Sequence, residues 1–176
     1  FQREIVLCVD QSGSMATSVV YASIFASVLA SIRSVKTSLV VYDTAVVDLT
    51  EKLTDPVDVI FGTQLGGGND TPRALRYCEQ LITRPHDTVL VLISDLYEGS
   101  GSAEMNRRLG ELHQAGATVI VLMALDDQGT PAYDHDNASE LAALGIPAFA
   151  CTPDAFPDLI AVAINRGDVH AWAEQQ

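Results

Sequence analysis

Short apolar runs alternate with longer amphipathic stretches along the whole chain. An almost continuous apolar run is typical of a strand that is covered on both faces, whereas an apolar stripe with a spacing of three or four residues predicts a helix. The second and third runs are joined by a tight turn at Asp43-Thr44, so this pair is expected to be antiparallel. Strands are predicted at residues 4–9, 37–42, 45–48, 88–93, 118–125 and 147–151.

Helices are expected between these strands. The first carries a stripe of small residues that lets a helix lie close to a sheet. Thr71 before Pro72 is a good N-cap for another helix. Asn137 has capping-box spacing to Glu140 and predicts the start of a helix that ends at Gly145. The predicted helices are 18–34, 56–62, 71–82, 103–115, 137–145 and 156–165, followed by a polar tail.

Strands separated by helices require crossover connections, which are right-handed and produce a mostly parallel sheet. We therefore expect a doubly wound α/β fold whose six-stranded sheet has one antiparallel edge strand and helices on both faces. Residues 1–176 fit a single domain. The start without methionine indicates a piece of a larger protein.

Composition narrows the classes of partner. The net charge is −13, which argues against nucleic acids and anionic membranes. No apolar run approaches the roughly 20 residues of a membrane span, and no signal peptide is visible. Each of Cys8, Cys78 and Cys151 sits inside an apolar pattern, which predicts reduced thiols and a cytoplasmic protein.

Candidate chemistry follows two of the predicted strands. Asp10-Gln-Ser-Gly-Ser14 comes after the first strand, and Ser94-Asp95 after the central one. Ligands of such folds bind at the carboxyl ends of strands near the switch in strand order, and two carboxylates brought together there favour a cation between them. Asp10, Ser12 and Ser14 alternate along the turn, so their oxygens can converge on a hard cation such as Mg²⁺.

The loop 10–14 resembles the Asp-x-Ser-x-Ser motif of von Willebrand factor A (VWA) domains and integrin inserted domains. The resemblance covers essentially the whole chain, because the order of motif loop, first helix, hairpin, glycine loop and central strand is the same. It implies a Rossmann-like fold with a metal-ion-dependent adhesion site (MIDAS) that holds Mg²⁺, with Mn²⁺ or Ca²⁺ as substitutes. The implied ligands are Asp10, Ser12, Ser14 and, through water or a hydroxyl, Asp95.

The second loop departs from the family pattern. The family has Gly-Gly-Thr five residues before an Ala-Leu pair, and that count from Ala74-Leu75 reaches Asn69. Asn69 could supply a carbonyl oxygen in place of the hydroxyl, or Asp70 could supply a carboxylate. Thr71 is a third choice, since it also suits the helix cap. The ligand from this loop is thus left between Asn69 and Asp70.

The resemblance also implies a role. In the family an acidic residue of a protein partner often completes the metal's coordination, which requires no catalysis. Cytoplasmic prokaryotic relatives often work beside AAA+ ATPases of the MoxR type, so such an ATPase or a neighbouring domain of the same chain is the expected partner. Further residues on the same edge could line this surface: Tyr97, Glu98, Asp126, Asp127, Tyr133, Asp134, His135 and Asp136.

An enzyme is the alternative. A metal-dependent hydrolase or phosphotransferase could use the same aspartates, but such enzymes need a second aspartate close behind the first and a lysine that clamps phosphate. Gln11 and Ser12 follow Asp10 instead. A serine hydrolase would need a Gly-x-Ser-x-Gly turn and a late histidine, and His170 lies in the polar tail. We therefore expect a binding module rather than an enzyme.

Overall fold

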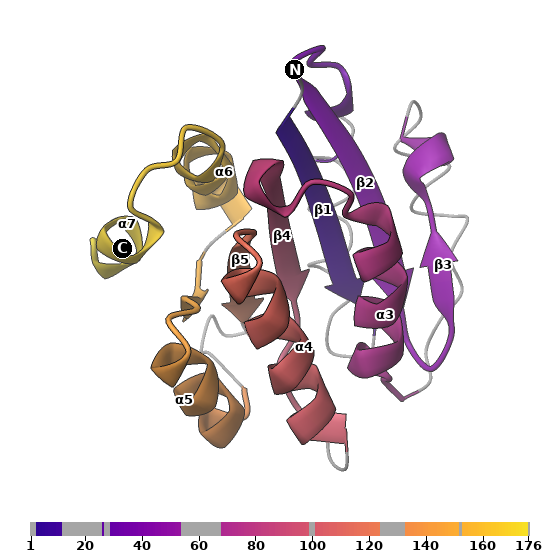
Figure 1. The fold of residues 1–176 in the computed structure, drawn as a ribbon, viewed down its shortest axis with the longest axis vertical. Helices are drawn as coiled ribbons and strands as arrows, with labels where there is room; N and C mark the ends of the chain where they lie inside the picture. Colours follow the sequence, from indigo (N-terminus) through magenta and orange to yellow (C-terminus); the bar gives the residue numbers. More distant parts are fainter. Residues whose placement is uncertain are drawn as a thin grey trace.

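The computed structural model describes residues 3–11, 26, 29–53, 68–98, 101–123, 133–151 and 153–175. Within them the chain forms one six-stranded sheet in the order β3-β2-β1-β4-β5-β6 (Figure 1). The sheet and its single antiparallel edge pair are those predicted from the sequence. The strands are β1 (Arg3–Asp10), β2 (Val35–Tyr42), β3 (Val46–Asp48), β4 (Thr88–Ile93), β5 (Thr118–Met123) and β6 (Ala148–Ala150).

Strand β1 lies inside the sheet, with further strands on both sides of it. Both β2 and β4 pair with β1 in parallel. The sheet then extends through antiparallel β3 on one side and through parallel β5 and β6 on the other. The strand order therefore reverses at β1, and the carboxyl end of β1 is the place where open α/β sheets bind their ligands.

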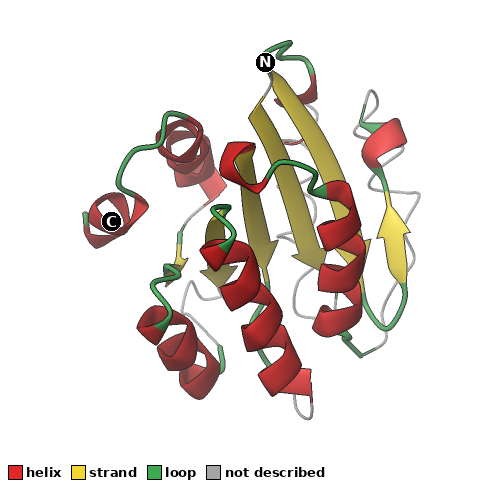
Figure 2. Ribbon diagram, viewed as in Figure 1, coloured by secondary structure: helices red, strands yellow, loops and turns green. Residues whose placement is uncertain are grey.

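Helices lie in front of the sheet in the view of Figure 2, and alternate residues of the central strands belong to two different core clusters. In β1, Ile5, Leu7 and Val9 belong to one core cluster, whereas Val6 and Cys8 belong to the other. Strand β4 shows the same alternation. Asp10, the last residue of β1, and Ser94, the residue after β4, therefore lie on the face of the second cluster.

The helices α3 (Thr71–Leu81), α4 (Ser102–Gln114) and α5 (His135–Ala143) supply this second face. Figure 1 shows α3 and α4 side by side in front of the sheet. Arg108 of α4 joins them, because Nη1 lies 2.8 Å from Glu79 of α3 while Nε lies 3.0 Å from Glu104. The N-termini of all three helices lie at the end of the sheet where the parallel strands end.

The other face is covered by α6 (Phe156–Ile164), with Ala26 and Leu29 of the first helix. The chain beyond residue 165, predicted to be a polar tail, contains a further helix, so this prediction is wrong. This helix is α7 (Val169–Glu174), whose N-cap Asp168 accepts a hydrogen bond from the Ala171 N–H. Burial of Val169 and a ring contact between Trp172 and Phe149, at 5.9 Å between centroids, stabilise this short helix.

Other predicted element ends differ from the structure. The first helix ends at Ala30 rather than 34, and its start and the predicted helix 56–62 lie outside the described residues. Asp70, not Thr71, caps α3, and Asp134, not Asn137, caps α5. Short 3-10 helices occur at Thr50–Lys52, Pro85–Asp87 and Pro153–Ala155.

Two further features of the described residues are the state of the cysteines and the length of the helices. All three cysteines are free thiols, and Cys8 and Cys78 are buried. Cys151 is only partly buried, and this burial raises its thiol pKa to about 11. Within the described ranges, every helix is too short or too polar to cross a bilayer.

Candidate metal site

Asp10 is the last residue of β1, and its side chain is completely buried at 0% exposure. Because Val9 pairs with Ile93, the residue that follows β4, Ser94, lies beside Asp10. Ser94 is also fully buried, and its hydroxyl donates a hydrogen bond of 3.3 Å to Asp10 Oδ2. The two strand ends that the sequence predicted to be neighbours therefore do meet.

The second loop reaches this carboxylate through Asn69. Its amide Nδ2 donates to Asp10 Oδ2 at 3.3 Å and to the Tyr97 carbonyl at 2.9 Å. The loop is anchored by the next residue, since the Asp70 N–H donates to the Asp43 carbonyl at 2.8 Å. One amide thus connects the end of β1 with the loop after β4.

The other two residues considered for this loop have different roles. Asp70 caps α3, where its Oδ1 accepts from the Arg73 N–H at 3.1 Å. Thr71 is buried, and its hydroxyl lies 2.8 Å from the Tyr42 hydroxyl. Burial raises the pKa of the Tyr42 phenol well above its usual range and keeps this pair neutral. Of Asn69, Asp70 and Thr71, the described contacts place only Asn69 against Asp10.

The third loop starts at Asp95, which is half-buried. Its Oδ1 accepts from the Tyr97 N–H at 3.1 Å. Between them, Leu96 has a positive φ of 65° and is only 1% exposed. A left-handed conformation costs a non-glycine residue roughly 1 kcal/mol or more, so the surrounding contacts must hold this turn in place.

The first loop is described only as far as Gln11, whose N–H donates to the Tyr42 carbonyl at 2.8 Å. Ser12 and Ser14 lie outside the described residues. Within the described part of the chain, no three His, Cys, Asp or Glu side chains are grouped as a metal ion would require.

Glu98 is a further carboxyl group at this edge, and the sequence indicated it only as a surface residue. Its Oε1 accepts from the Thr71 N–H at 2.8 Å, and its Oε2 is buried without a hydrogen bond to any described residue. Burial raises the Glu98 pKa to about 7, and the negative charges of Asp70 and Asp10 add to the shift. A carboxylate three residues beyond Asp95 was the available sequence signal.

The donors at this edge suit a hard divalent cation. The described side chains around Asp10 offer carboxylate, hydroxyl and amide groups, which Mg²⁺ and Ca²⁺ prefer to nitrogen or sulfur ligands. Burial is the main cause of the raised pKa of Glu98, and the negative charges of Asp70 and Asp10 add to it. A cation at Asp10 would offset these charges, so the residues fit the ion that the resemblance implies.

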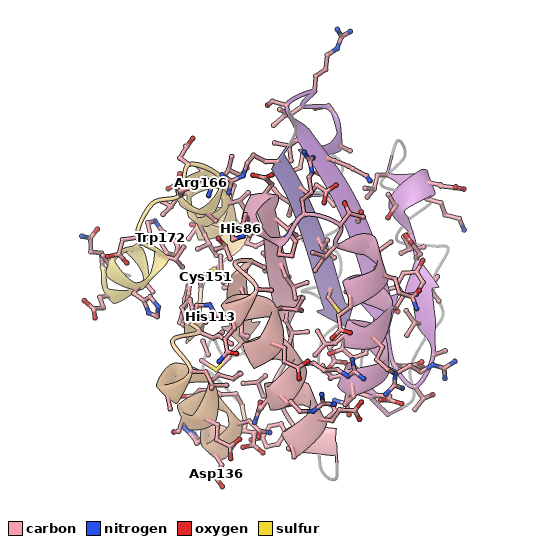
Figure 3. All side chains as sticks on the ribbon, in the orientation of Figure 1. His86, His113, Asp136, Cys151, Arg166 and Trp172 are labelled. Atoms are coloured by element: carbon pink, nitrogen blue, oxygen red, sulfur yellow. The ribbon has the colours of Figure 1, made fainter. Side chains whose placement is uncertain are left out.

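Aromatic and acidic residues surround the site. Tyr97 is 53% exposed, and its hydroxyl donates to the Tyr133 carbonyl at 3.0 Å. The Tyr133 ring lies 4.2 Å from the His135 ring between centroids. Figure 3 shows Asp136 at the end of the molecule toward which β1 and β4 run, whereas His86 and Arg166 lie toward the other end. Asp126 and Asp127 are outside the described residues.

The pKa of Glu98 predicts a pH-dependent stability. Because the pKa of Glu98 in the folded state is about 7, above the usual 4.5, the free energy of unfolding should fall as pH rises from 4.5 through 7. In EDTA at pH 8, the free energy of unfolding of Glu98→Gln should therefore exceed that of wild type by roughly 1 kcal/mol. The difference is this small because solvent screens the charge of a half-exposed group. The two should be equally stable near pH 4. Chemical denaturation across this range checks it, and equal stability at pH 8 contradicts it.

Comparison with known proteins identifies relatives of the chain. Residues 1–159 match the family described as "VWA domain containing CoxE-like protein". The chain is also 42% identical over 152 residues, 86% of its length, to the uncharacterized protein YehP of Escherichia coli (strain K12). That match spans only 40% of YehP.

Solved structures share the fold at low sequence identity. A von Willebrand factor type A protein from Catenulispora acidiphila has a TM-score of 0.67 at 14% identity, covering 93% of this chain and 43% of that one. An aerotolerance-related membrane protein from Bacteroides fragilis has a TM-score of 0.66 at 15% identity, covering 93% and 99%. Manganese-loaded TRAP protein from Plasmodium vivax has a TM-score of 0.59 at 13% identity, covering 88% and 70%. These likenesses show the fold, and the family match over residues 1–159 shows that the chain belongs to the CoxE-like family of proteins that contain a VWA domain.

Proposed function

We propose that this domain is a non-catalytic interaction module that binds a protein partner through a divalent cation at Asp10. VWA domains are a family with metal-dependent roles in protein interaction, and the chain belongs to that family. The observation that carries the proposal is the fully buried carboxylate of Asp10 at the switch point, contacted by Asn69 and Ser94. An acidic group in that position is suited to hold a cation at the protein surface.

The proposed ligands are Asp10, Ser12 and Ser14 from the first loop, Asn69 from the second, and Asp95 through water. An amide has both a donor and an acceptor. Asn69 can therefore hold Asp10 through Nδ2 and offer Oδ1 to the cation. Asp70 was an equal candidate from the sequence, but its carboxylate caps α3, so we assign it to the helix rather than to the metal.

Mg²⁺ is the proposed ion. Few carboxylates, several neutral oxygens and room for water suit a cation that retains part of its hydration shell. The structurally similar TRAP protein was solved loaded with manganese, which supports testing Mn²⁺ alongside Mg²⁺ and Ca²⁺. When bound, the ion would act as a Lewis acid that accepts an oxygen ligand from the partner.

The proposed partner supplies an acidic residue to this ion. A MoxR-type AAA+ ATPase, or another domain of the same chain, fits the family resemblance. A second domain is a reasonable source because the chain spans only 40% of the length of its relative YehP. A cytoplasmic location, which is expected from the sequence, is part of what we propose.

The competing function is a metal-dependent hydrolase or phosphotransferase. Glu98 is a described carboxyl group at this edge whose pKa, raised to about 7, would suit acid–base chemistry. Its Oε1, however, is engaged by the Thr71 N–H. Metal binding without turnover of generic phosphate and ester substrates would favour the interaction module.

The first prediction concerns the metal. Asp10→Asn removes the charged ligand without changing its size, so Mg²⁺ affinity should fall by roughly tenfold or more, equal to about 1.4 kcal/mol. Asp43→Asn is the matched control, because Asp43 is another buried carboxylate at this edge. Its amide oxygen can still accept from the Ala45 N–H. Isothermal titration calorimetry measures both.

A general effect of negative charge predicts equal losses in Asp10→Asn and Asp43→Asn, whereas ligation predicts a loss only in the first. A folded Asp10→Asn protein that binds Mg²⁺ as tightly as wild type would falsify the assignment.

A second prediction distinguishes between Asn69 and Asp70, the two candidate ligands of the second loop. Asn69→Ala should weaken Mg²⁺ binding, and Asn69→Thr, which restores the family's residue, should retain it. Asp70→Ala should leave the affinity nearly intact but lower the stability by about 1 kcal/mol through loss of the helix cap. Titration calorimetry and thermal denaturation distinguish these effects, and the assignment fails if Asp70→Ala alone abolishes binding.

A third prediction concerns the partner. The MoxR-type ATPase of the same organism should co-purify with this protein in Mg²⁺ but not in EDTA. Asp10→Asn should lose the complex, and Asp43→Asn should keep it. A complex that survives both EDTA and Asp10→Asn would show that the metal is not the contact.

A further inference from the structure

The first residues of the loop after β4 are hydrogen-bonded to the segment that begins α5. The Asp134 N–H donates to the Asp95 carbonyl at 2.9 Å. The Asn137 side chain donates through Nδ2 to the Leu96 carbonyl at 2.8 Å. The Tyr97 hydroxyl donates to the Tyr133 carbonyl at 3.0 Å. Three successive residues of the loop are thus each held by the segment 133–137.

Asn137 is the buried member of this set, at 5% exposure. Besides Leu96, its Nδ2 lies 3.0 Å from Ser102 Oγ. Its Oδ1 accepts from Asn106 Nδ2 at 3.1 Å, and its N–H donates to Asp134 Oδ1 at 3.0 Å. A side chain whose amide oxygen and nitrogen are both engaged in a buried layer has a fixed orientation, so the donor that it presents to Leu96 is also fixed.

The residue that Asn137 holds has an unfavourable backbone conformation. Leu96 has a φ of 65°, and such a conformation persists only where surrounding contacts maintain it. The neighbours of Leu96 carry the groups that matter for the metal. Asp95 provides a candidate ligand, and the Tyr97 carbonyl accepts from Asn69, which also contacts Asp10. A change at Leu96 would therefore reach both the second and third loops.

We propose that Asn137 is a positioning residue of the metal site, which acts through the Leu96 carbonyl without touching the ion. This inference rests on the proposed function, since it assumes that Asp10 and its neighbours bind a cation. Groups that orient the ligands of a metal from outside its first coordination sphere commonly change metal affinity by 10- to 100-fold when removed.

The test compares Asn137→Ala with Asn137→Asp and with Leu112→Ala. The aspartate keeps the acceptor for Asn106 and removes the donor to Leu96. Leu112 is buried near the far end of α4, so its replacement destabilises the fold away from the site. Titration calorimetry with Mg²⁺ is performed at a temperature at which all variants are folded. Both Asn137 variants should lose about tenfold in affinity, and Leu112→Ala should match wild type.

Hydrogen exchange gives a second readout that does not require metal. The Leu96 N–H donates to Ser94 Oγ and the Tyr97 N–H to Asp95 Oδ1, and both amides should exchange faster in Asn137→Ala but not in Leu112→Ala. Wild-type affinity in the folded Asn137 variants overturns the proposal, whatever the exchange rates. Wild-type exchange at both amides also overturns it. If the wild type binds no Mg²⁺, the proposed function fails, and exchange alone decides whether Asn137 holds the loop.

Discussion

The completely buried carboxylate of Asp10, at the end of β1, requires polar partners from the loops around it. Burying the charge of Asp10 is costly unless donors or a cation offset it. The hydroxyl of Ser94 and the amide of Asn69 both donate to the same oxygen, Oδ2. Because these donors come from different loops, the carboxylate fixes the positions of the second and third loops relative to β1.

The neighbouring polar groups have other contacts. Asp70 satisfies the start of α3, Thr71 bonds Tyr42, and Glu98 accepts from the Thr71 N–H. These contacts leave Asn69 to bridge Asp10 and Tyr97. Burial is the main cause of the raised pKa of Glu98, and the negative charges of Asp70 and Asp10 add to it. A divalent ion at Asp10 would offset these charges.

Local patterns predicted the sheet well, because strands buried on both faces must be apolar throughout and residues 88–93 form β4 as expected. The resemblance of residues 10–14 to a known motif led to the candidate site at the end of β1, where Asn69 and Ser94 contact Asp10. The helix caps were less predictable. Thr71 and Asn137 have the residue types of caps, yet their side chains bond Tyr42 and Leu96, which lie 29 and 41 residues away in the chain.

The same limit explains α7 and the choice between Asn69 and Asp70. Helix α7 has only six residues and so predicts little by itself, but Val169 and Trp172 contact apolar surface on the completed core. Asn69 and Asp70 are adjacent and both offer oxygen, so composition could not separate them. Only the position of the loop beside Asp10 shows that one side chain faces the strand end and the other faces its own helix.

The alternation of β1 between two layers also limits how this chain can vary in length. Val6 and Cys8 face α3, α4 and α5, and Asp10 follows them in phase toward the loops that contact it. Inserting or deleting one residue between Ile5 and Val9 would reverse that phase and turn the carboxylate toward the layer of α6. Apolar residues of β1 can thus be exchanged for one another far more readily than the strand can gain or lose a residue, and related sequences should align along β1 without gaps.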